Sequence, residues 1–424
     1  MSGQAANWAR NVVFGATDLR TPSSVGELQE IVRGSDEVRA LGTGHSFNRI
    51  ADTTGVLVST SGLPPVIEVL PRGSAVKVAG GVRYGELAQQ LHGAGFGLRN
   101  LGSLPHISVA GACATGTHGS GDANQSLAAS VTALEMVTAD GELARLERGS
   151  PEFTGAVTAL GGLGIVTTVE LEVVPAFEVR QFVYEDIPAA AVGAHFEEIF
   201  TSAYSVSVFT DWRGGSGTRV WQKQRVDVPG SGTAGGGQAS WLGGRLADGP
   251  RNPVPGMAAE NATEQMGVPG PWQERLPHFR LAFTPSSGEE LQSEYLVPRE
   301  SSGAAIEALG RIGGRIAPVL QIAEIRTIAA DDLWMSMAFE RDTVGFHFTW
   351  IQDDAAVTPV VSAIEEALAP FAARPHWGKV FAVPPQTVRG LYPRWDDFAA
   401  LLRRYDPAGK FRNEFMDRYF PPGA

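Results

Sequence analysis

Apolar stripes at helical spacing alternate with short apolar runs in the first third of the chain. One stripe follows Ser24, and the spacing of Ser24 and Glu27 is typical of a capping box, which predicts that a helix begins there. A second helix is expected after Gly80 and Gly81, and Gly93 is expected to end it. The predicted strands of this part of the chain are Val38–Leu41, Ala75–Ala79, Val131–Val137 and 165–173.

The pattern changes near Pro175, where we expect a domain boundary. Further strands are predicted at 204–209, 219–221, 319–328 and 344–350, and further helices at 360–371 and 398–405. Residues 228–255 are rich in glycine and serine, which predicts a surface loop or a flexible insertion. Residues 102–121 are dense in small and hydroxyl side chains, and we expect this stretch to be too polar for a core.

Composition and charge narrow the function classes. The 424 residues are enough for two or three domains, and the formal net charge is −12 without a long basic run. This charge argues against nucleic acid or an anionic membrane as the main partner. No run of about 18 apolar residues predicts a membrane span, and the first residues lack the pattern of a signal peptide. Cys113 is the one cysteine, so we expect a cytoplasmic protein with no disulfide and no metal site.

Two glycine-rich segments are the first candidates for a binding site. Gly42-Thr43-Gly44 follows a predicted strand and offers free backbone N–H groups, which suit a diphosphate, although a tight turn explains the glycines equally well. Position 47 is Phe, so the Rossmann fingerprint is absent, and no P-loop motif occurs. Because residues 108–119 form a second small-residue segment, the pair indicates one extended ligand, such as a dinucleotide.

These segments carry a family resemblance. ALGTGHSF at 40–47, VRYGEL at 82–87 and GACATGTHG at 111–119 resemble the FAD-binding domain of the vanillyl-alcohol-oxidase family. Within that family, SLPHIS at 103–108, EIR at 324–326, HFT at 347–349 and HWGK at 376–379 resemble the alditol oxidases. The resemblance extends to residues 406–411, but it does not cover 228–255.

The resemblance implies a fold and a cofactor. It implies an α+β protein with a two-domain vanillyl-alcohol-oxidase-type FAD-binding fold: residues 1–176 bind FAD, 177–387 form a substrate domain with an antiparallel sheet, and 388–424 return to the FAD domain. It also implies a covalent bond between FAD and His45. The implied FAD contacts are Ala40, Leu41, Gly42, Thr43, Gly44, His45, Ser46, Ser103, Ser108, Gly111, Ala112, Cys113, Ala114, Thr115, His118, Ile165 and His376.

The chemistry of His45 and Cys113 agrees with one covalent link. A neutral imidazole is a competent nucleophile near pH 7, although a histidine in a turn can instead bond a backbone carbonyl. Some relatives attach FAD through both histidine and cysteine. Cys113 lies within the small-residue segment and is expected to pack there as a small apolar group.

Strand alternation gives independent evidence for a polar site. In 320–328, Glu324 and Arg326 share one face with apolar residues. The two side chains form either a structural ion pair or a site for a polyol. In 344–350, His347 and Thr349 share the face opposite three aromatic side chains, a pattern that an ordinary half-exposed strand also has. Lys379, by itself, is equally compatible with a solvated lysine.

The resemblance assigns roles to these residues. It implies that Ser103, Glu324, Arg326, Thr349 and Lys379 bind a sugar alcohol, with Arg326 and Lys379 stabilising charge on the reacting oxygen. His347 is a candidate proton acceptor. The expected reaction converts the C1 hydroxyl of xylitol or sorbitol to an aldehyde and reduces O2 to hydrogen peroxide, and we expect a monomer.

Alternative functions remain open at this point. A sugar-1,4-lactone oxidase or dehydrogenase shares the glycine-rich segments and a similar His-Trp-Lys-type ending. A non-catalytic protein that binds flavin or a sugar belongs to another class. A nicotinamide enzyme is disfavoured because its fingerprint is missing.

Overall fold

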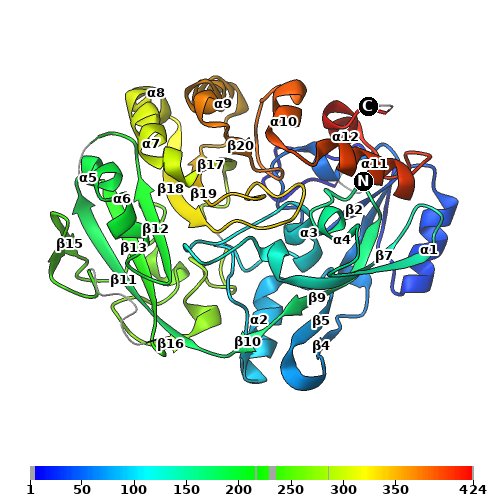
Figure 1. Cartoon of the computed structure of the whole chain (residues 1–424), viewed down its shortest axis with the longest axis horizontal. Coiled ribbons are helices and arrows are strands. Elements are labelled where there is room, and N and C mark those ends of the chain that lie inside the picture. Colours follow the sequence, from blue (N-terminus) through cyan, green and yellow to red (C-terminus); the bar gives the residue numbers. More distant parts are fainter. Residues whose placement is uncertain (1–4, 215–216, 229–234, 285, 423–424) are drawn as a thin grey trace.

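The computed structural model describes residues 5–214, 217–228, 235–284 and 286–422, apart from the side chain of Arg72. Its helices and sheets form two regions that lie side by side (Figure 1). The two ends of the chain build one region, and the middle of the chain builds the other around a ten-stranded sheet. This architecture confirms the predicted α+β class.

The first region contains a five-stranded antiparallel sheet and a smaller parallel sheet. Its strands are β1 (Asp18–Arg20), β2 (Val38–Leu41), β3 (Val56–Ser59), β4 (Ile67–Val69), β5 (Ala75–Ala79), β6 (Phe96–Gly97), β7 (Val131–Val137), β8 (Leu143–Glu147), β9 (Ile165–Glu172) and β10 (Val174–Pro175), and its first helices are α1 (Val25–Gly34), α2 (Tyr84–Gly93), α3 (Val109–Ala114) and α4 (Phe153–Ala156). The sheet orders are β4-β5-β9-β7-β8 and β1-β3-β2, and β6 pairs with β10.

The second region is one large antiparallel sheet with helices against it. Its strands are β11 (Glu178–Ile187), β12 (Ser205–Thr210), β13 (Thr218–Arg225), β14 (Ser240–Trp241), β15 (Gly244–Leu246), β16 (Gly270–Pro271), β17 (Leu291–Pro298), β18 (Leu320–Ile328), β19 (Thr343–Trp350) and β20 (Arg374–Pro375), and its helices are α5 (Ala189–Ala194), α6 (Phe196–Phe200), α7 (Ser302–Arg311), α8 (Gly313–Ile316) and α9 (Asp354–Leu368). The order is β14-β15-β11-β13-β12-β18-β19-β17-β20, with β16 beside β11. None of the described helices is long and apolar enough to cross a bilayer.

The C-terminal segment returns to the first region. Its helices are α10 (Pro385–Leu391), α11 (Trp395–Tyr405) and α12 (Glu414–Tyr419). Phe411 is fully buried in a cluster with Leu28 and Val32 of α1, and the Lys410 carbonyl accepts a hydrogen bond from Val38 N–H at 2.9 Å. The last segment thus contacts α1 and β2 directly, although more than 300 residues separate them in sequence.

The apolar pattern located most elements closely. Strands β2, β5 and β7 have the predicted bounds, and α1 begins after Ser24, whose Oγ accepts the Glu27 N–H at 3.1 Å. The capping box is only half formed, because the Glu27 carboxylate accepts the N–H of Ser23 and not that of Ser24.

The prediction that residues 102–121 are too polar for a core was wrong. This stretch contains α3, and Val109, Ala112 and Cys113 are buried in the main core cluster. Small side chains here allow close contact between backbones: a Cβ on Gly119 would stand 2.3 Å from the Leu101 carbonyl oxygen. The residues are small because other chain segments approach closely, and not because water surrounds them.

The segment 228–255 is more ordered than its composition predicts. Its strands β14 and β15 pair with each other, and β15 pairs with β11 at the end of the large sheet. Pro253 and Val254 reach the wall of the central cavity. Residues 229–234 of this predicted loop lie outside the described residues.

Phe411 provides a test of how the C-terminal segment contributes to stability. We expect Phe411→Ala to lower the free energy of unfolding by about 3–5 kcal/mol, because the substitution removes a fully buried ring from its cluster. Urea denaturation followed by circular dichroism measures this. Phe411→Leu keeps most of the volume and should cost clearly less; equal stability of the alanine variant and the wild type would contradict the packing described here.

Candidate active site

An elongated cavity lies between the two regions. It encloses about 1730 Å³ of space, counted to its open mouth. Residues 40–48 and 102–118 form its wall on the side of the first region. Strands β17, β18 and β19 and the loop 376–379 supply polar side chains on the other side. The cavity therefore joins the two glycine-rich segments to the predicted substrate residues.

Thr43 connects the two glycine-rich segments. Its Oγ1 accepts a hydrogen bond from the Ser108 N–H at 3.2 Å. A Cβ on Gly42 would stand 2.3 Å from Ser108 Oγ, so this approach requires glycine. Gly44 has a φ of +69°, the left-handed region that favours glycine. The glycines thus allow the two segments to meet and also leave their backbone on the cavity wall.

His45 lies on that wall directly after the glycines. Its ring stacks on Trp8 with centroids 5.1 Å apart, and its Nδ1 lies 3.1 Å from Thr43 Oγ1. Its Nε2 is buried without a hydrogen-bond partner. Burial, helped by nearby His106, lowers the pKa of His45 to about 4. The imidazole is therefore neutral near pH 7 and has one unused nitrogen, as a nucleophile requires.

All but two of the predicted cofactor residues line the cavity. Those that do are Ala40, Leu41, Gly42, Thr43, Gly44, His45, Ser46, Ser103, Ser108, Gly111, Ala112, Ala114, Thr115, His118 and His376. Cys113 points away, with Sγ 3.5 Å from the Tyr84 hydroxyl, and burial raises the pKa of its thiol to about 11. The Ile165 side chain packs in the cluster around Phe411, because alternation along β9 turns it to the opposite side.

The residues present fit FAD. A cavity that is walled by the two glycine-rich segments on one side and by polar side chains on the other suits a dinucleotide. The buried and unpartnered Nε2 of His45 is an independent feature that a covalent bond would use. The segments 40–46 and 108–115 are the ones that would hold the cofactor.

The pairing of β17, β18 and β19 determines the polar end of the cavity. Glu324 lies opposite His347, and His347 lies opposite Glu294 on the next strand. Because directly opposed residues share a face, these three side chains form one row across the sheet. Phe346 and Phe348, on the other face, are buried in the main core. The predicted alternation along 344–350 therefore agrees with the observed strand.

Glu294 is the centre of this row. Its carboxylate accepts hydrogen bonds from Arg326 Nη2 at 2.7 Å and from Lys379 Nζ at 2.6 Å. His118 Nε2 lies 3.3 Å from the same carboxylate. Glu294 is 1% exposed. Burial raises the pKa of Glu294, but Arg326 and Lys379 outweigh this and hold the pKa well below its ordinary value.

Lys379 and His347 form a second contact. Lys379 Nζ lies 2.7 Å from His347 Nδ1, and His347 Nε2 lies 3.1 Å from Thr349 Oγ1. An ammonium can only donate, so Nδ1 accepts and Nε2 carries the ring proton. Burial, together with Lys379, lowers the pKa of His347 to about 4, which agrees with a neutral ring. Burial also lowers the pKa of Lys379.

Backbone contacts fix Lys379 relative to the cofactor side. The Asn48 carboxamide donates to the carbonyl oxygens of Trp377 and Lys379, each at 2.8 Å. The Phe47 N–H donates to the Gly378 carbonyl at 2.7 Å. The loop that carries Lys379 is thus held by the residues that directly follow His45.

Ser103 and Glu324 complete the predicted substrate set. Arg326 Nη1 donates to Ser103 Oγ at 3.3 Å. Arg326 Nε lies 3.7 Å from Glu324 Oε2, too far for a hydrogen bond. Burial raises the pKa of Glu324, but Arg326 and His278 outweigh it and hold the pKa below its ordinary value. Ser103, Glu324, Arg326, His347, Thr349 and Lys379 all line the cavity.

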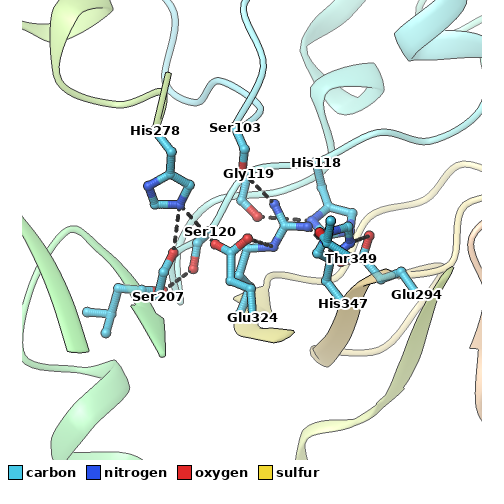
Figure 2. Close-up of polar contacts among 12 residues, drawn as sticks. Ser103, His118, Gly119, Ser120, Ser207, His278, Glu294, Glu324, His347 and Thr349 are labelled. Carbon is cyan, nitrogen blue, oxygen red and sulfur yellow. Dashed lines mark hydrogen bonds and ion pairs between the residues drawn. The ribbon is translucent and has the colours of Figure 1, made fainter. Parts of the chain in front are cut away.

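Sequence reasoning missed Glu294 and His278. His278 Nε2 lies 2.9 Å from Glu324 Oε1, next to the predicted substrate residues (Figure 2). A signal for Glu294 exists: Gln292 and Glu294 are two residues apart in 291–298 and so share one face of the strand, as Glu324 and Arg326 do in theirs. His278 lies outside the strands and has no such signal.

Among the described residues, one group has the ligand geometry of a metal site: His118, Glu294 and His376, whose ligand atoms lie within 4.8 Å of one another. Glu294 already accepts from Arg326 and Lys379. A metal cation there would be repelled by the two adjacent positive charges. We therefore interpret the three side chains as part of the hydrogen-bonded network and not as metal ligands.

Comparison with known proteins gives matches over both regions. Residues 19–147 match the family described as FAD binding domain, and residues 287–419 match the family described as D-arabinono-1,4-lactone oxidase. An alditol oxidase from a Streptomyces species is 49% identical over 421 residues, covering 98% of this chain and 99% of that protein. An L-gulono-1,4-lactone dehydrogenase from Mycobacterium tuberculosis is 30% identical over 443 residues, covering 100% of both chains.

Solved structures agree on the fold. The cholesterol oxidase from B. sterolicum superposes with a TM-score of 0.79 over 98% of this chain and 96% of that chain. The sequence identity is 16%, so this likeness shows the fold alone. It supports the predicted two-region FAD-binding architecture of the vanillyl-alcohol-oxidase type.

The buried histidines predict how stability depends on pH. His278 and His347 have a pKa of about 4 when folded, against 6.5 for an ordinary histidine. Between pH 4 and pH 6.5 the unfolded chain therefore binds more protons than the folded chain. The free energy of unfolding should therefore fall as pH decreases from 6.5 towards 4, by up to about 1.4 kcal/mol per pH unit for each histidine.

Urea denaturation at about pH 7, 6 and 5 checks this. His347→Gln removes one of these groups and should make the dependence shallower. His195→Gln, at an exposed position, serves as the matched control and should leave the slope unchanged. Stability that is constant over this window would contradict the burial of neutral histidines.

Proposed function

Because this chain belongs to the alditol oxidase family of FAD-dependent oxidoreductases, we propose that it oxidises the terminal C1 hydroxyl of an alditol to an aldehyde. Xylitol and sorbitol are the proposed substrates and O2 is the proposed electron acceptor. One observation carries the proposal: Glu324, Arg326 and Lys379 line the same cavity as the glycine-rich segments that fit FAD. The monomeric state and the cytoplasmic location stay predictions from the sequence.

FAD would be held by the glycine-rich segments and by a covalent bond to His45. When bound, FAD accepts a hydride from the carbinol carbon and passes the two electrons to O2, which gives hydrogen peroxide. The neutral ring of His45 and its unpartnered Nε2 support the covalent bond. The second attachment seen in some relatives is not proposed, since the thiol of Cys113 points to Tyr84.

Three groups of the polar row bind and orient the alditol. The Glu324 carboxylate accepts hydroxyl protons, while Arg326 and Lys379 donate to hydroxyl oxygens. Ser103 and Thr349 add one hydroxyl each at the same end of the cavity. Several fixed donors and acceptors hold C1 in one orientation, which lowers the entropy cost of reaching the transition state.

Arg326 and Lys379 also stabilise the reacting oxygen. Negative charge develops on the C1 oxygen as its proton leaves, and both cations are already held in place by Glu294. Donors oriented before the reaction need no rearrangement when the charge appears.

The pair Lys379 and His347 is the proposed proton acceptor. Lys379 Nζ can pass one of its protons to His347 Nδ1, 2.7 Å away, and take the hydroxyl proton in its place. The oxygen–hydrogen bond breaks, a nitrogen–hydrogen bond forms on the imidazole, and the hydride leaves C1.

A sugar-1,4-lactone is the second candidate substrate. The match of residues 287–419 to the D-arabinono-1,4-lactone oxidase family favours it, because that range contains the polar row. The greater identity to the alditol oxidase, 49% against 30% for the lactone dehydrogenase, favours the alditol.

Anaerobic mixing of the purified yellow protein with xylitol tests the substrate. We expect the flavin absorbance to bleach with xylitol and to persist with L-gulono-1,4-lactone. Bleaching by the lactone alone would move the proposal to the second candidate.

Arg326→Ala should lower kcat by about 10²–10³-fold, because a donor to the reacting oxygen is lost. Near-normal turnover of that variant, with its flavin content unchanged, would remove Arg326 from the mechanism.

The covalent link has a separate test. Denatured wild-type protein should keep its flavin fluorescence on a denaturing gel, because the bond survives unfolding. His45→Ala should lose the fluorescent band. Cys113→Ala is the control and should keep the band, since the Cys113 side chain faces away from the cavity. A fluorescent band in the His45 variant would place the bond elsewhere.

A further inference from the structure

His278 links two of the proposed substrate-binding residues. Its backbone N–H donates to the Ser103 carbonyl at 3.2 Å, and its Nε2 lies 2.9 Å from Glu324 Oε1. Arg326 Nη1 in turn donates to Ser103 Oγ. Figure 2 shows His278 and Ser103 close to each other above the Glu324 carboxylate. Hydrogen bonds thus connect Glu324, His278, Ser103 and Arg326 in a chain. The two ends of this chain, Glu324 and Arg326, face each other across a gap of 3.7 Å.

Glu324 determines which nitrogen of His278 carries the proton. Its carboxylate oxygen Oε1, 2.9 Å from His278 Nε2, can only accept, so Nε2 carries the hydrogen. Lys223, which is 2% exposed and donates to the Leu276 carbonyl, lies 3.4 Å from the other ring nitrogen, Nδ1. His278 therefore donates to the Glu324 carboxylate. Ser207 Oγ, 3.3 Å from Nε2, is the other polar group facing this nitrogen.

The contact with His278 is the sole hydrogen bond that the described residues give to the Glu324 side chain. Arg326 Nε is buried without a hydrogen-bond partner, and it faces Glu324 Oε2 at 3.7 Å. Opposite charges this close attract each other, and a small rotation would bring them into hydrogen-bond contact. His278 holds the other carboxylate oxygen and opposes that rotation.

We propose that His278 is a positioning residue that keeps Glu324 from closing onto Arg326. The gap then leaves one free acceptor, Glu324 Oε2, beside one free donor, Arg326 Nε. A single substrate hydroxyl can accept from the donor and give its proton to the acceptor. This inference rests on the alditol oxidation proposed above, and it assigns the Glu324–Arg326 gap to a hydroxyl next to the reacting carbon.

Two amide variants test the role of His278. The amide nitrogen of His278→Gln reaches the position of Nε2, whereas the shorter side chain of His278→Asn reaches only the position of Nδ1. His278→Asn should raise KM for xylitol by about 10- to 100-fold with a smaller effect on kcat, because a hydrogen bond to a charged group is lost. His278→Gln should restore KM to within about threefold of the wild-type value.

The pH profile provides a readout that simple loss of packing would not change. Without the His278 donor the pKa of Glu324 should rise, so the acid limb of kcat/KM should move to higher pH in His278→Asn and not in His278→Gln. His92→Asn, on α2 outside the cavity, is the control and should match the wild type.

The outcomes separate the two proposals. If xylitol does not bleach the flavin of the wild-type protein, the proposed function fails before any variant is compared. If the wild type bleaches and both amide variants keep the wild-type KM and acid limb, the positioning role is wrong. An equal loss in both variants with an unmoved acid limb would also overturn it, because the position of the donor would then be irrelevant.

Discussion

The buried carboxylate of Glu294 is the interaction on which the candidate site depends. Two cations, Arg326 of β18 and Lys379 of the loop 376–379, lie close to this carboxylate, and each would be costly to bury alone. Glu294 pairs with both cations within hydrogen-bond distance, and Glu324, 3.7 Å from Arg326, supplies the second negative charge. The strand register places it in the same row as Glu324, with His347 between them, so three neighbouring strands share one network of charges. Such a network is rigid, because each member loses its partner if another moves.

The second general feature is that the substrate side is attached to the cofactor side by backbone hydrogen bonds. Asn48 and Phe47 hold the loop of Lys379, and His278 holds the Ser103 carbonyl. These contacts cross between regions that are far apart in sequence. They set the distance between the end of the cavity that fits a flavin and the groups that would hold a hydroxyl. Orientation of this kind is a large part of what an enzyme contributes to a hydride transfer.

The comparisons with known proteins distinguish what determines the fold from what determines the substrate. The overall fold is shared with a cholesterol oxidase at 16% identity, so the architecture does not determine the substrate. The candidate site consists of a few side chains on one sheet face and on the loop 376–379 beside it. Alditol and lactone relatives both match this chain over nearly its whole length. Similarity over the whole chain therefore does not by itself separate the two substrate classes.

The sequence by itself determined the local structure and the side of each strand on which a residue lies. Apolar spacing located β2, β5 and β7, and alternation placed Glu324 with Arg326 and His347 with Thr349. Glycine spacing marked the two segments that meet at Thr43 and Ser108. Only the tertiary structure decided which groups face one another: that Glu294 balances two cations, that His278 holds Glu324, and that Cys113 and Ile165 turn away from the cavity. The physical reason is that periodicity is a property of one segment, whereas charge balance in a buried site depends on partners from several segments and on the register between them.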